Sequence, residues 1–482
     1  MPGYAEVAAR SNHTLLEGAS HPWELVATAK ALGHAGIGLC DLNSLAGVVR
    51  GHVAARKAGL RYAVGCRLRL VDGSEWLAWP TDRASYGRLA RLLSLGGMRA
   101  PAGGFEVTFA EMAEHAHGWV VAAVPPEGPR EGPDGPFAAR LRDRAAALRP
   151  KLAMPLLVAA WNGYRGDDRD RIRSLSDVAA KAGGSMLATN DVLHHHPGRR
   201  RLADVLSAIR LWTTVDALGD AAQRNAERHL KAPGEMARLF PDHPEALANT
   251  LRVLDAASGF SLDQLRHEYP DEILEPGRTP QQTLVARVAE AVRERWPDGA
   301  PEDIRRRLRH ELRVVEELGY APYFLTVHEI VRFARSRGIQ CQGRGSAANS
   351  TICYVLGITA VDPEKHDLLF ERFISASRGE PPDIDVDFEH ERREEVIRHV
   401  YERYGRERAA IVGTVVRFRA RAAVREVGKA LGLSGDVTAR LARAAWGAGT
   451  DRDLAGIARE EGLDPGDRRL RLAIESARRR DR

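Results

Sequence analysis

Three aspartates alternate with apolar residues in the segment Asp383-Ile384-Asp385-Val386-Asp387-Phe388. On an extended strand, this period of two places the carboxylates on one face and the apolar side chains on the other. Like charges on one face repel one another unless a cation lies among them, and a divalent metal is the obvious candidate. The segment therefore predicts a strand that presents a metal site, and paired Mg²⁺ is the usual means of moving phosphoryl groups.

A glycine motif, Gly343-Arg344-Gly345-Ser346-Ala347-Ala348-Asn349-Ser350, precedes an apolar helix that we expect over 351–356. Glycines let the backbone approach a ligand closely, and the free N–H groups of a helix start favour an anion. Ser346 is a candidate N-cap, and Arg344 adds a positive charge. The pattern predicts a phosphate-binding loop.

Other interpretations of the two motifs stay open at this point. The glycine motif lacks the Gly-Lys-Ser/Thr of a Walker loop, but it fits the loose dinucleotide form G-x-G-x-x-A, with Asp362 about 20 residues on. Asp362 lies in a predicted turn, however, and a simple helix cap is a third interpretation.

The acidic segment begins as a calcium loop would and has Glu394 at the twelfth position. Phe388 stands where that loop requires Gly, which excludes it.

The two motifs together are more specific than either alone. Between them lies Leu369-Phe370-Glu371-Arg372-Phe373, and Arg378 follows. Arg372 and Arg378 are candidates for binding the negative charge of a triphosphate. A phosphate loop, two arginines and an acidic strand together predict nucleotidyl transfer with two metal ions.

The elements that precede these motifs follow two patterns. Predicted strands at 36–41, 62–65, 119–124, 155–159 and 186–191 alternate with helices that include 22–33 and 45–59. This is the β/α repeat of a parallel sheet or barrel. Farther along the chain the pattern is helical, with a charged helix expected over 301–318 and a second helix over 323–337.

Composition excludes several classes of protein. Of the 482 residues 44% are hydrophobic, enough for several domains, and the four cysteines include no C-x-x-C pair. No signal peptide or membrane-spanning segment is evident, so we expect a cytoplasmic protein.

Residues 416–482 hold 16 Arg and Lys against 10 Asp and Glu, a net charge of +6 that equals that of the whole chain. This favours a polyanion partner, although an Arg-rich composition explains it equally well.

At this point the motifs resemble the palm of the C-family bacterial DNA polymerases, the family of the polymerase III alpha subunit. The resemblance rests on 343–350, 369–373 and 382–388, and it extends over nearly the whole chain. Segments 16–22 and 44–50 are most similar to the error-prone paralogue that acts in damage-induced translesion synthesis and DNA repair.

The resemblance implies an α/β multidomain chain. It implies a polymerase-and-histidinol-phosphatase (PHP) β/α barrel over 1–260, a first palm segment with polymerase-beta-like nucleotidyltransferase topology over 261–415, and a small, basic, helical thumb over 416–482. It also implies Mg²⁺ as cofactor, primer-template DNA and dNTPs as substrates, and other translesion or replication proteins as partners.

The resemblance assigns roles to the motif residues. The family's first two catalytic, metal-binding aspartates fall on Asp383 and Asp385, with Asp387 as a candidate neighbour. The expected nucleotide- and phosphate-binding residues are Gly343, Arg344, Gly345, Ser346, Arg372 and Arg378. The family's third aspartate lies on a later palm strand, and neither it nor the clamp-binding region is expected before Arg482. We therefore expect a C-terminally truncated chain without polymerase activity of its own.

The N-terminal region departs from active PHP domains. Ala8 and Arg10 replace an early His-x-His pair, Leu42 follows Asp41 where His is expected, and Arg67 stands at a Glu position. The remnants of the metal site are Asp41, Asp191 and His194. So few ligands cannot hold a multinuclear metal centre, which predicts a structural domain. The triplet 194–196 is expected to be a solvated turn.

Three functions follow from these observations. The first is a DNA-directed DNA polymerase of the error-prone type, in which Asp383 and Asp385 hold Mg²⁺ and the glycine motif holds the triphosphate. The second is a non-catalytic module that binds DNA or a protein partner through the PHP scaffold and the basic thumb. The third is a PHP phosphoesterase, against which the missing ligands argue.

Overall fold

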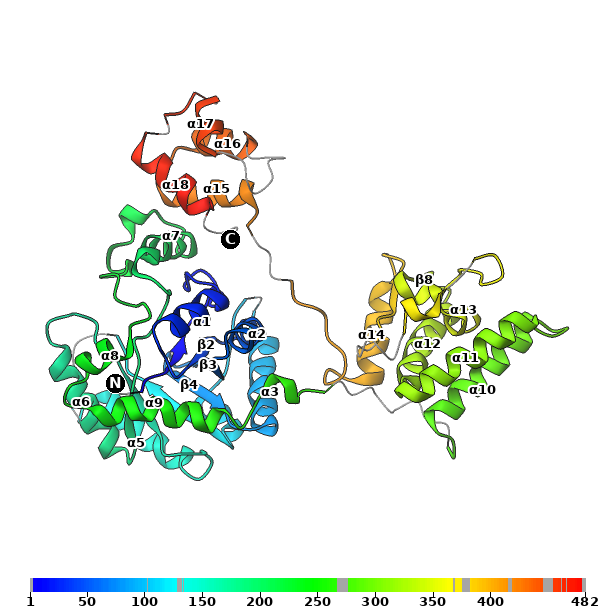
Figure 1. The fold of residues 1–482 in the computed structure, drawn as a ribbon, viewed down its shortest axis with the longest axis horizontal. Helices are drawn as coiled ribbons and strands as arrows, with labels where there is room; N and C mark the ends of the chain where they lie inside the picture. Colours follow the sequence, from blue (N-terminus) through cyan, green and yellow to red (C-terminus); the bar gives the residue numbers. More distant parts are fainter. Residues whose placement is uncertain are drawn as a thin grey trace. The chain divides into compact units, whose positions relative to one another are not determined.

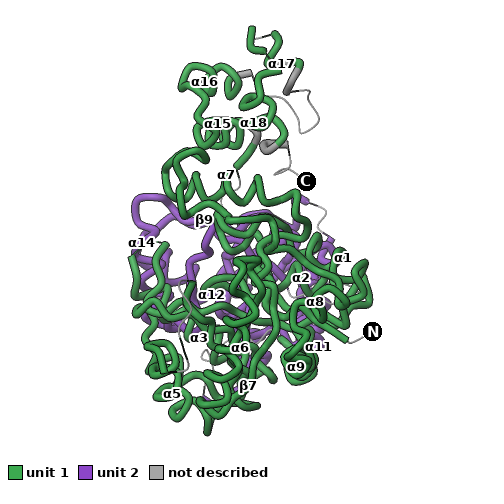
Figure 2. The backbone as a smooth tube through the Cα atoms, turned by 90° about the vertical axis from the view of Figure 1, so that its left-hand side faces the viewer, with its two compact units in different colours: residues 1–265, 416–482 green, residues 266–415 purple. Residues whose placement is uncertain are grey.

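A computed structural model describes residues 3–101, 103–127, 132, 134–266, 276–366, 369–374, 382–414, 418–444, 454–460, 462–464 and 466–478. The chain divides into two compact units, coloured separately in Figure 2. The first consists of Met1–Leu265 and Val416–Arg482, and the second of Arg266–Val415. The glycine motif and the acidic segment both belong to the second unit.

A seven-stranded sheet forms the core of the first unit, with its strands side by side in sequence order. The strands are β1 (Glu6–Ala9), β2 (Gly36–Leu42), β3 (Arg61–Arg69), β4 (Glu75–Pro80), β5 (Trp119–Val124), β6 (Leu157–Ala160) and β7 (Ser185–Ala188). Figure 1 labels β2, β3 and β4 of this sheet. β4 is antiparallel to both neighbours, and the other pairs are parallel. The predicted α/β pattern is confirmed. The closed barrel is not, because β1 and β7 are the end strands of an open, mixed sheet.

Hydrogen bonds outside the sheet ladder join the segments at β1 and β7. The buried carboxylate of Glu6, on β1, accepts hydrogen bonds from Thr189 Oγ1 and Asn190 N, both at 2.8 Å. Arg10 N donates to Val192 O at 2.9 Å. These bonds bring the residues that follow β1 beside those that follow β7, and so create one wall of the cavity described below.

In the described residues before position 260, the first unit has nine α-helices. They are α1 (Pro22–Ala31), α2 (Val48–Ala58), α3 (Arg83–Arg99), α4 (Phe109–His115), α5 (Pro136–Leu148), α6 (Asp168–Lys181), α7 (Arg200–Arg210), α8 (Pro233–Leu239) and α9 (Pro244–Ala257). Buried residues of α9 recur at steps of three and four, which is the spacing of one helix face. α9 packs so closely on the sheet that a Cβ at Gly36 would lie 2.5 Å from Leu254 Cδ2.

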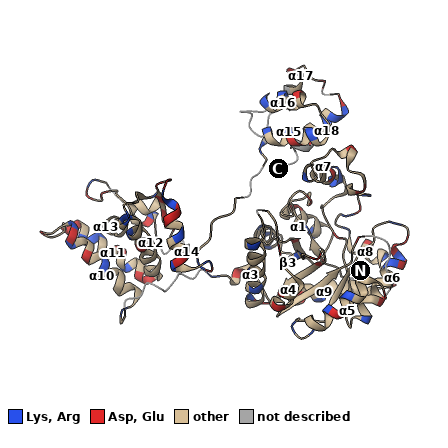
Figure 3. Cartoon of the chain, turned by 180° about the vertical axis from the view of Figure 1, so that it is seen from behind, with Lys and Arg blue, Asp and Glu red and all other residues tan. Residues whose placement is uncertain are grey.

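Four C-terminal helices in the described residues belong to the same unit. They are α15 (Ala420–Ala430), α16 (Gly435–Ala444), α17 (Leu454–Glu460) and α18 (Arg468–Arg478). Two of them, α15 and α18, share a buried cluster with α7. Val427 and Ala473 share a buried cluster with Val205 of α7, and Arg469 pairs with Asp216 at 2.8 Å. Figure 3 shows Lys and Arg on α15 and α16. Their assignment as a thumb stays a prediction.

The second unit is a helical core with a two-stranded antiparallel sheet. Its elements are α10 (Pro280–Arg295), α11 (Glu302–Leu318), α12 (Ala321–Ser336), β8 (Cys341–Arg344), η5 (Gly345–Asn349), α13 (Thr351–Val355), η6 (Phe370–Arg372), β9 (Asp385–Phe388) and α14 (Arg393–Tyr404). The predicted helices at 301–318 and 323–337 are confirmed as α11 and α12. The described part of this unit contains only these two strands, so the palm topology stays a prediction.

No helix in the described ranges is both long enough and apolar enough to cross a membrane.

Candidate functional site

The glycine motif and the acidic segment form neighbouring strands of one sheet. In the antiparallel register of β8 and β9, Arg344 lies opposite Asp385 and Gln342 lies opposite Asp387. Opposed residues of such a pair project from the same face, so both carboxylates share a face with Arg344. Two motifs that are far apart in sequence thus form one polar surface.

The alternation predicted for the acidic segment is confirmed. Ile384 is buried, and Val386 packs against the same core cluster. Asp387 is exposed, and the side chain of Asp385 is 44% exposed. The predicted start of the strand is wrong, because β9 begins at Asp385. Exposed Asp383 precedes the strand, and the next amide, Ile384 N, donates instead to the Tyr323 hydroxyl at 2.9 Å.

Arg344 supplies the positive charge of this surface. Its Nε lies 3.0 Å from Asp387 Oδ2, and its Nη1 lies 3.5 Å from Asp385 Oδ2. The hydrogen bond to Asp387, followed by the charges of Asp387 and Asp385, raises the pKa of Arg344. The predicted phosphate-binding arginine is therefore paired with carboxylates in this structure.

The donor set fits a divalent metal. Carboxylate oxygens are the ligands that Mg²⁺ prefers, and Arg344 shows that this face already attracts a cation. Asp383 and Asp385 would hold the metal, while Asp387 is the closer partner of Arg344. Within the described ranges, no group of three or more His, Cys, Asp or Glu side chains is arranged as a metal site.

The two glycines of the motif are required for different structural reasons. A Cβ at Gly343 would lie 2.5 Å from Ile358 O, so this glycine is required by a close approach of two backbone segments. Gly345 has a φ of +69°, in the left-handed region that side chains disfavour, and a Cβ at this position would lie 3.4 Å from Asp385 Oδ2. Of the two, only Gly345 borders the carboxylates.

Ser346 is not the N-cap of the apolar helix, which corrects the sequence prediction. The helix is α13, and its N-cap is Ser350, whose Oγ accepts from Cys353 N at 3.2 Å. Ser346 lies within the tight turn η5 instead. The reason is that η5 takes up residues 345–349, so the helix begins only after residue 350.

A buried carboxylate already occupies the start of α13. Glu311, on α11, is 2% exposed and accepts from Thr351 N at 2.8 Å and Ile352 N at 3.0 Å. Ser350 Oγ donates to it at 2.8 Å. An anionic ligand therefore cannot use these amides, which leaves Gly345 and Ser346 as the part of the motif where the predicted phosphate binding could occur. Sequence reasoning missed Glu311, although a carboxylate on the apolar stripe of α11 was a signal.

The two other predicted phosphate-binding residues are less well placed by the structure. Arg372 is exposed at the end of η6, and η6 lies against η5. Arg378 lies outside the described residues.

The remnants of the predicted PHP metal site lie at the end of the sheet of the first unit. Asp41 is buried and accepts from Ser11 N at 2.7 Å, Ser11 Oγ at 2.7 Å and Thr14 Oγ1 at 2.8 Å. Burial raises its pKa, although these hydrogen bonds act against the shift. Asp41 thus fixes the loop that follows β1.

Asp191 is surrounded by arginines. Its Oδ1 lies 2.9 Å from Arg10 Nη2 and 2.6 Å from Arg67 Nη1, and its Oδ2 pairs with Arg228. Burial alone raises the pKa of Asp191, but the charges of the three arginines outweigh it and hold the pKa below its usual range. Arg10 and Arg67 stand at the very positions where metal ligands were expected. Nothing in the sequence indicated that Arg228 would pair with Asp191.

The prediction of a solvated turn at 194–196 is wrong for His194. This side chain is 1% exposed, and burial followed by the nearby charge of His229 lowers its pKa to about 3. His194 is buried because backbone hydrogen bonds hold its segment against residue 228. Leu193 N and His194 N both donate to Arg228 O, at 2.9 and 3.3 Å.

Comparison with known proteins gives two family matches. Residues 282–480 match the bacterial DNA polymerase III alpha NTPase domain, and residues 7–148 match the PHP domain. The error-prone DNA polymerase of Brucella abortus biovar 1 (strain 9-941) is 50% identical over 99% of this chain, and that of Rhodopseudomonas palustris (strain BisB5) is 48% identical over 99%. The chain spans only 44% and 43% of the length of these relatives.

Among solved structures, an amidohydrolase from Chromobacterium violaceum aligns with 40% of this chain and 88% of its own. The identity is 13% and the TM-score is 0.32.

Proposed function

We propose that this chain, which belongs to the family of the bacterial DNA polymerase III alpha subunit, supplies the metal-binding and triphosphate-binding residues of an error-prone DNA polymerase. The observation that carries the proposal is the pairing of β8 with β9, which sets Arg344 opposite Asp385. A cationic side chain and carboxylates on one face, beside Gly345, form a surface suited to a metal-bound triphosphate.

The residues of this surface would have different roles in binding the metal and the triphosphate. Asp383 and Asp385 would hold Mg²⁺, which when bound neutralises the triphosphate and favours attack by the primer 3′-hydroxyl. Arg344 would exchange its carboxylate partners for phosphate oxygens, with which a guanidinium forms strong, charge-assisted hydrogen bonds. The first N–H groups of η5, at Gly345 and Ser346, have no partner within the turn itself and would orient the phosphates.

Two carboxylates do not complete a two-metal site. Asp387 lies on the same strand as Asp385 and is the closest partner of Arg344, so it is poorly suited to supply a third ligand from another direction. We therefore propose that residues 1–482 bind nucleotide in the presence of Mg²⁺ but do not extend a primer. The polymerase activity itself requires groups beyond those that this surface presents.

The test is Mg²⁺-dependent binding of dATP to the 482-residue chain, measured by calorimetry. We expect D383N and D385N each to weaken binding by tenfold or more, on the scale of one charge-assisted contact of roughly 1.5–3 kcal/mol. D362N is the matched control, because Asp362 would matter only in a dinucleotide site. Loss of binding in D362N but not in D385N would contradict the proposal, as would efficient primer extension by D385N.

A second candidate function is a non-catalytic module that binds DNA. The observation that favours it is the excess of positive charge in residues 416–482. Binding of duplex DNA that weakens steeply with salt and survives D383N and D385N would support this function.

A further inference from the structure

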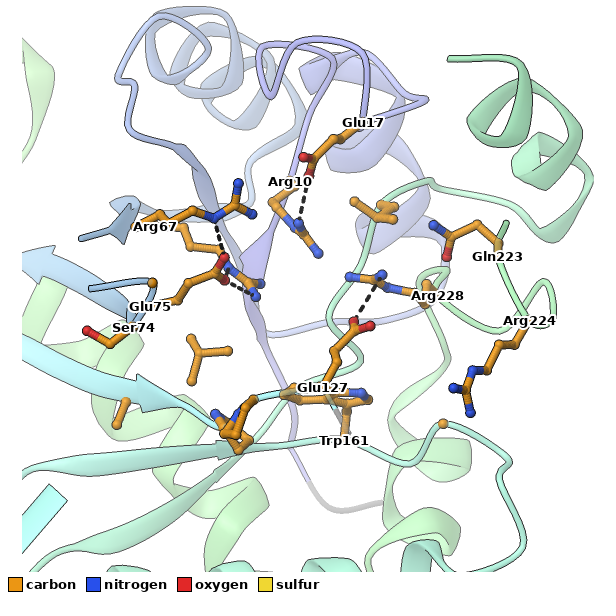
Figure 4. Close-up of a pocket in the computed structure, with 18 of the residues that line it drawn as sticks. Arg10, Glu17, Arg67, Ser74, Glu75, Glu127, Trp161, Gln223, Arg224 and Arg228 are labelled. Atoms are coloured by element: carbon orange, nitrogen blue, oxygen red, sulfur yellow. Dashed lines mark hydrogen bonds and ion pairs between the residues drawn. The ribbon is translucent and has the colours of Figure 1, made fainter. Parts of the chain in front are cut away.

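The first unit contains a cavity of about 720 Å³ that is unusually rich in arginine (Figure 4). The arginines that line it are Arg10, Arg67, Arg69, Arg140, Arg144, Arg165, Arg210, Arg224 and Arg228. Its acidic lining residues are fewer, namely Glu17, Asp72, Glu75, Glu127, Asp220 and Glu227. The described lining therefore carries an excess of three positive charges.

The inner arginines of the cavity are fixed by carboxylates. Arg10 and Arg67 both bind Asp191, and Arg67 also pairs with Glu75 at 2.5 Å. Arg10 is only 4% exposed, yet its Nε has no hydrogen-bond partner within the described residues. This Nε is enclosed by the protein, so it is not a donor for a ligand in the cavity. The inner end of the cavity is thus lined by guanidinium groups that carboxylates hold in place.

The outer arginines lack carboxylate partners. Within the described ranges, no ion pair is formed by Arg140, Arg165, Arg210 or Arg224. Figure 4 shows Arg224 and Arg228 on one side of the cavity and Arg67 and Glu75 on the other. Arg67 and Arg228 are paired with carboxylates, so the excess positive charge comes from the outer arginines, which raise the local potential and attract anions. The same potential opposes a divalent cation at this end of the sheet.

Size and composition narrow the class of ligand. The volume lies within the range of small-molecule sites, and Trp161 contributes an aromatic side chain to the lining. Guanidinium groups bind phosphate oxygens through paired hydrogen bonds. We propose that this cavity binds a phosphate-bearing small molecule of nucleotide size, and that it does so without a metal ion.

The test is calorimetric titration of the 482-residue chain with dATP in excess EDTA, which silences the Mg²⁺-dependent surface on β9. Inorganic pyrophosphate and deoxyadenosine serve as the phosphate-only and phosphate-free probes. We expect dATP and pyrophosphate to bind, and deoxyadenosine not to bind. The double variant R140E/R224E should weaken binding by about tenfold or more, because two charge-assisted contacts are lost. Both residues are exposed, so the variant should fold.

R50E is the matched control, because Arg50 is exposed on α2 and does not line the cavity. Three outcomes would overturn the proposal: no binding in EDTA, equal binding of dATP and deoxyadenosine, or equal weakening by R50E and R140E/R224E. Binding that appears only with Mg²⁺ would assign the nucleotide to β9 and leave the cavity without the ligand proposed for it. The cavity and the β9 surface therefore fail or succeed separately.

Discussion

Arg344 lies directly opposite Asp385 across the two-stranded sheet, and its guanidinium also reaches Asp387 at 3.0 Å. The arginine of the glycine motif and the acidic strand therefore stabilise one another before any ligand binds. At the site that we propose, a divalent metal would compete with Arg344 for these carboxylates, whereas a triphosphate would draw Arg344 away from them. The proposal therefore implies that the two ligands are coupled through one side chain.

Replacing Arg344 separates these two effects. In R344Q the competing cation is gone, so we expect Mn²⁺ to bind the carboxylates roughly two- to fivefold more tightly, the scale of an exposed ion pair. The binding of dATP should weaken at the same time, because a phosphate contact is lost. Mn²⁺ binding can be followed by electron paramagnetic resonance, and dATP binding by calorimetry. R398Q, an exposed arginine change on α14, should alter neither affinity. Weaker Mn²⁺ binding in R344Q would contradict the coupling.

Glu311 should contribute strongly to the stability of the second unit. E311A leaves the amides of Thr351 and Ile352 without their acceptor, and we expect a loss of about 2 kcal/mol in the free energy of unfolding. E317A, on the exposed side of the same helix, should change it by less than about 0.5 kcal/mol. Urea unfolding monitored by circular dichroism gives both values. Equal losses in the two variants would show that the buried contacts contribute nothing.

Glu311 also predicts a pH dependence. Burial raises its pKa above the usual value of about 4.3, so the folded state holds the proton more tightly than the unfolded state does. The contribution of Glu311 to stability is therefore greatest below the usual pKa, and it declines as pH rises through the raised pKa. E311Q does not titrate, so its stability relative to the parent should improve over that rise. A difference that is constant with pH would contradict this assignment.

The sequence allowed local features to be predicted and left long-range partners unpredicted. The alternation that begins at Asp383 depends only on a period of two, so the exposed and buried faces of β9 were predictable. The acceptor at the start of α13 was not, because Glu311 reaches it only after α11 packs on that helix. The same holds for Arg10 and Asp191, which are separated by 181 positions. The sequence showed that Arg10 replaces an expected metal ligand and that Asp191 is retained. It did not show that the two side chains contact each other.

The shape of the sheet in the first unit illustrates the same limit. The strands were predicted from runs of apolar residues, and most of their positions were confirmed. Whether such strands close into a barrel depends on pairing between the first and the last. Here side-chain bonds from Glu6 take the place of that pairing.

Gly343 should tolerate no side chain. In G343A the new Cβ would meet Ile358 O at 2.5 Å and Thr359 Cγ2 at 2.9 Å, which forces the backbone segments apart. We expect a loss of about 1–3 kcal/mol in the unfolding free energy of the second unit, typical of overpacking. G413A, where nothing lies within 4 Å, is the control and should be nearly neutral. Urea midpoints distinguish the two, and a neutral G343A would contradict the close approach.

Asp191 should stabilise the first unit through the charges that surround it. In D191N, Arg10, Arg67 and Arg228 lose a buried counter-charge, and we expect a loss of about 3–5 kcal/mol at neutral pH. Because the arginines hold the folded pKa of Asp191 below its usual value of about 3.9, its contribution is present above that value and declines as pH falls toward the folded pKa. The difference between D191N and the parent should therefore shrink in acid. D255N, which removes an exposed partner of Arg61, is the control. A D191N effect that grows in acid would show that the three surrounding arginines are not its cause.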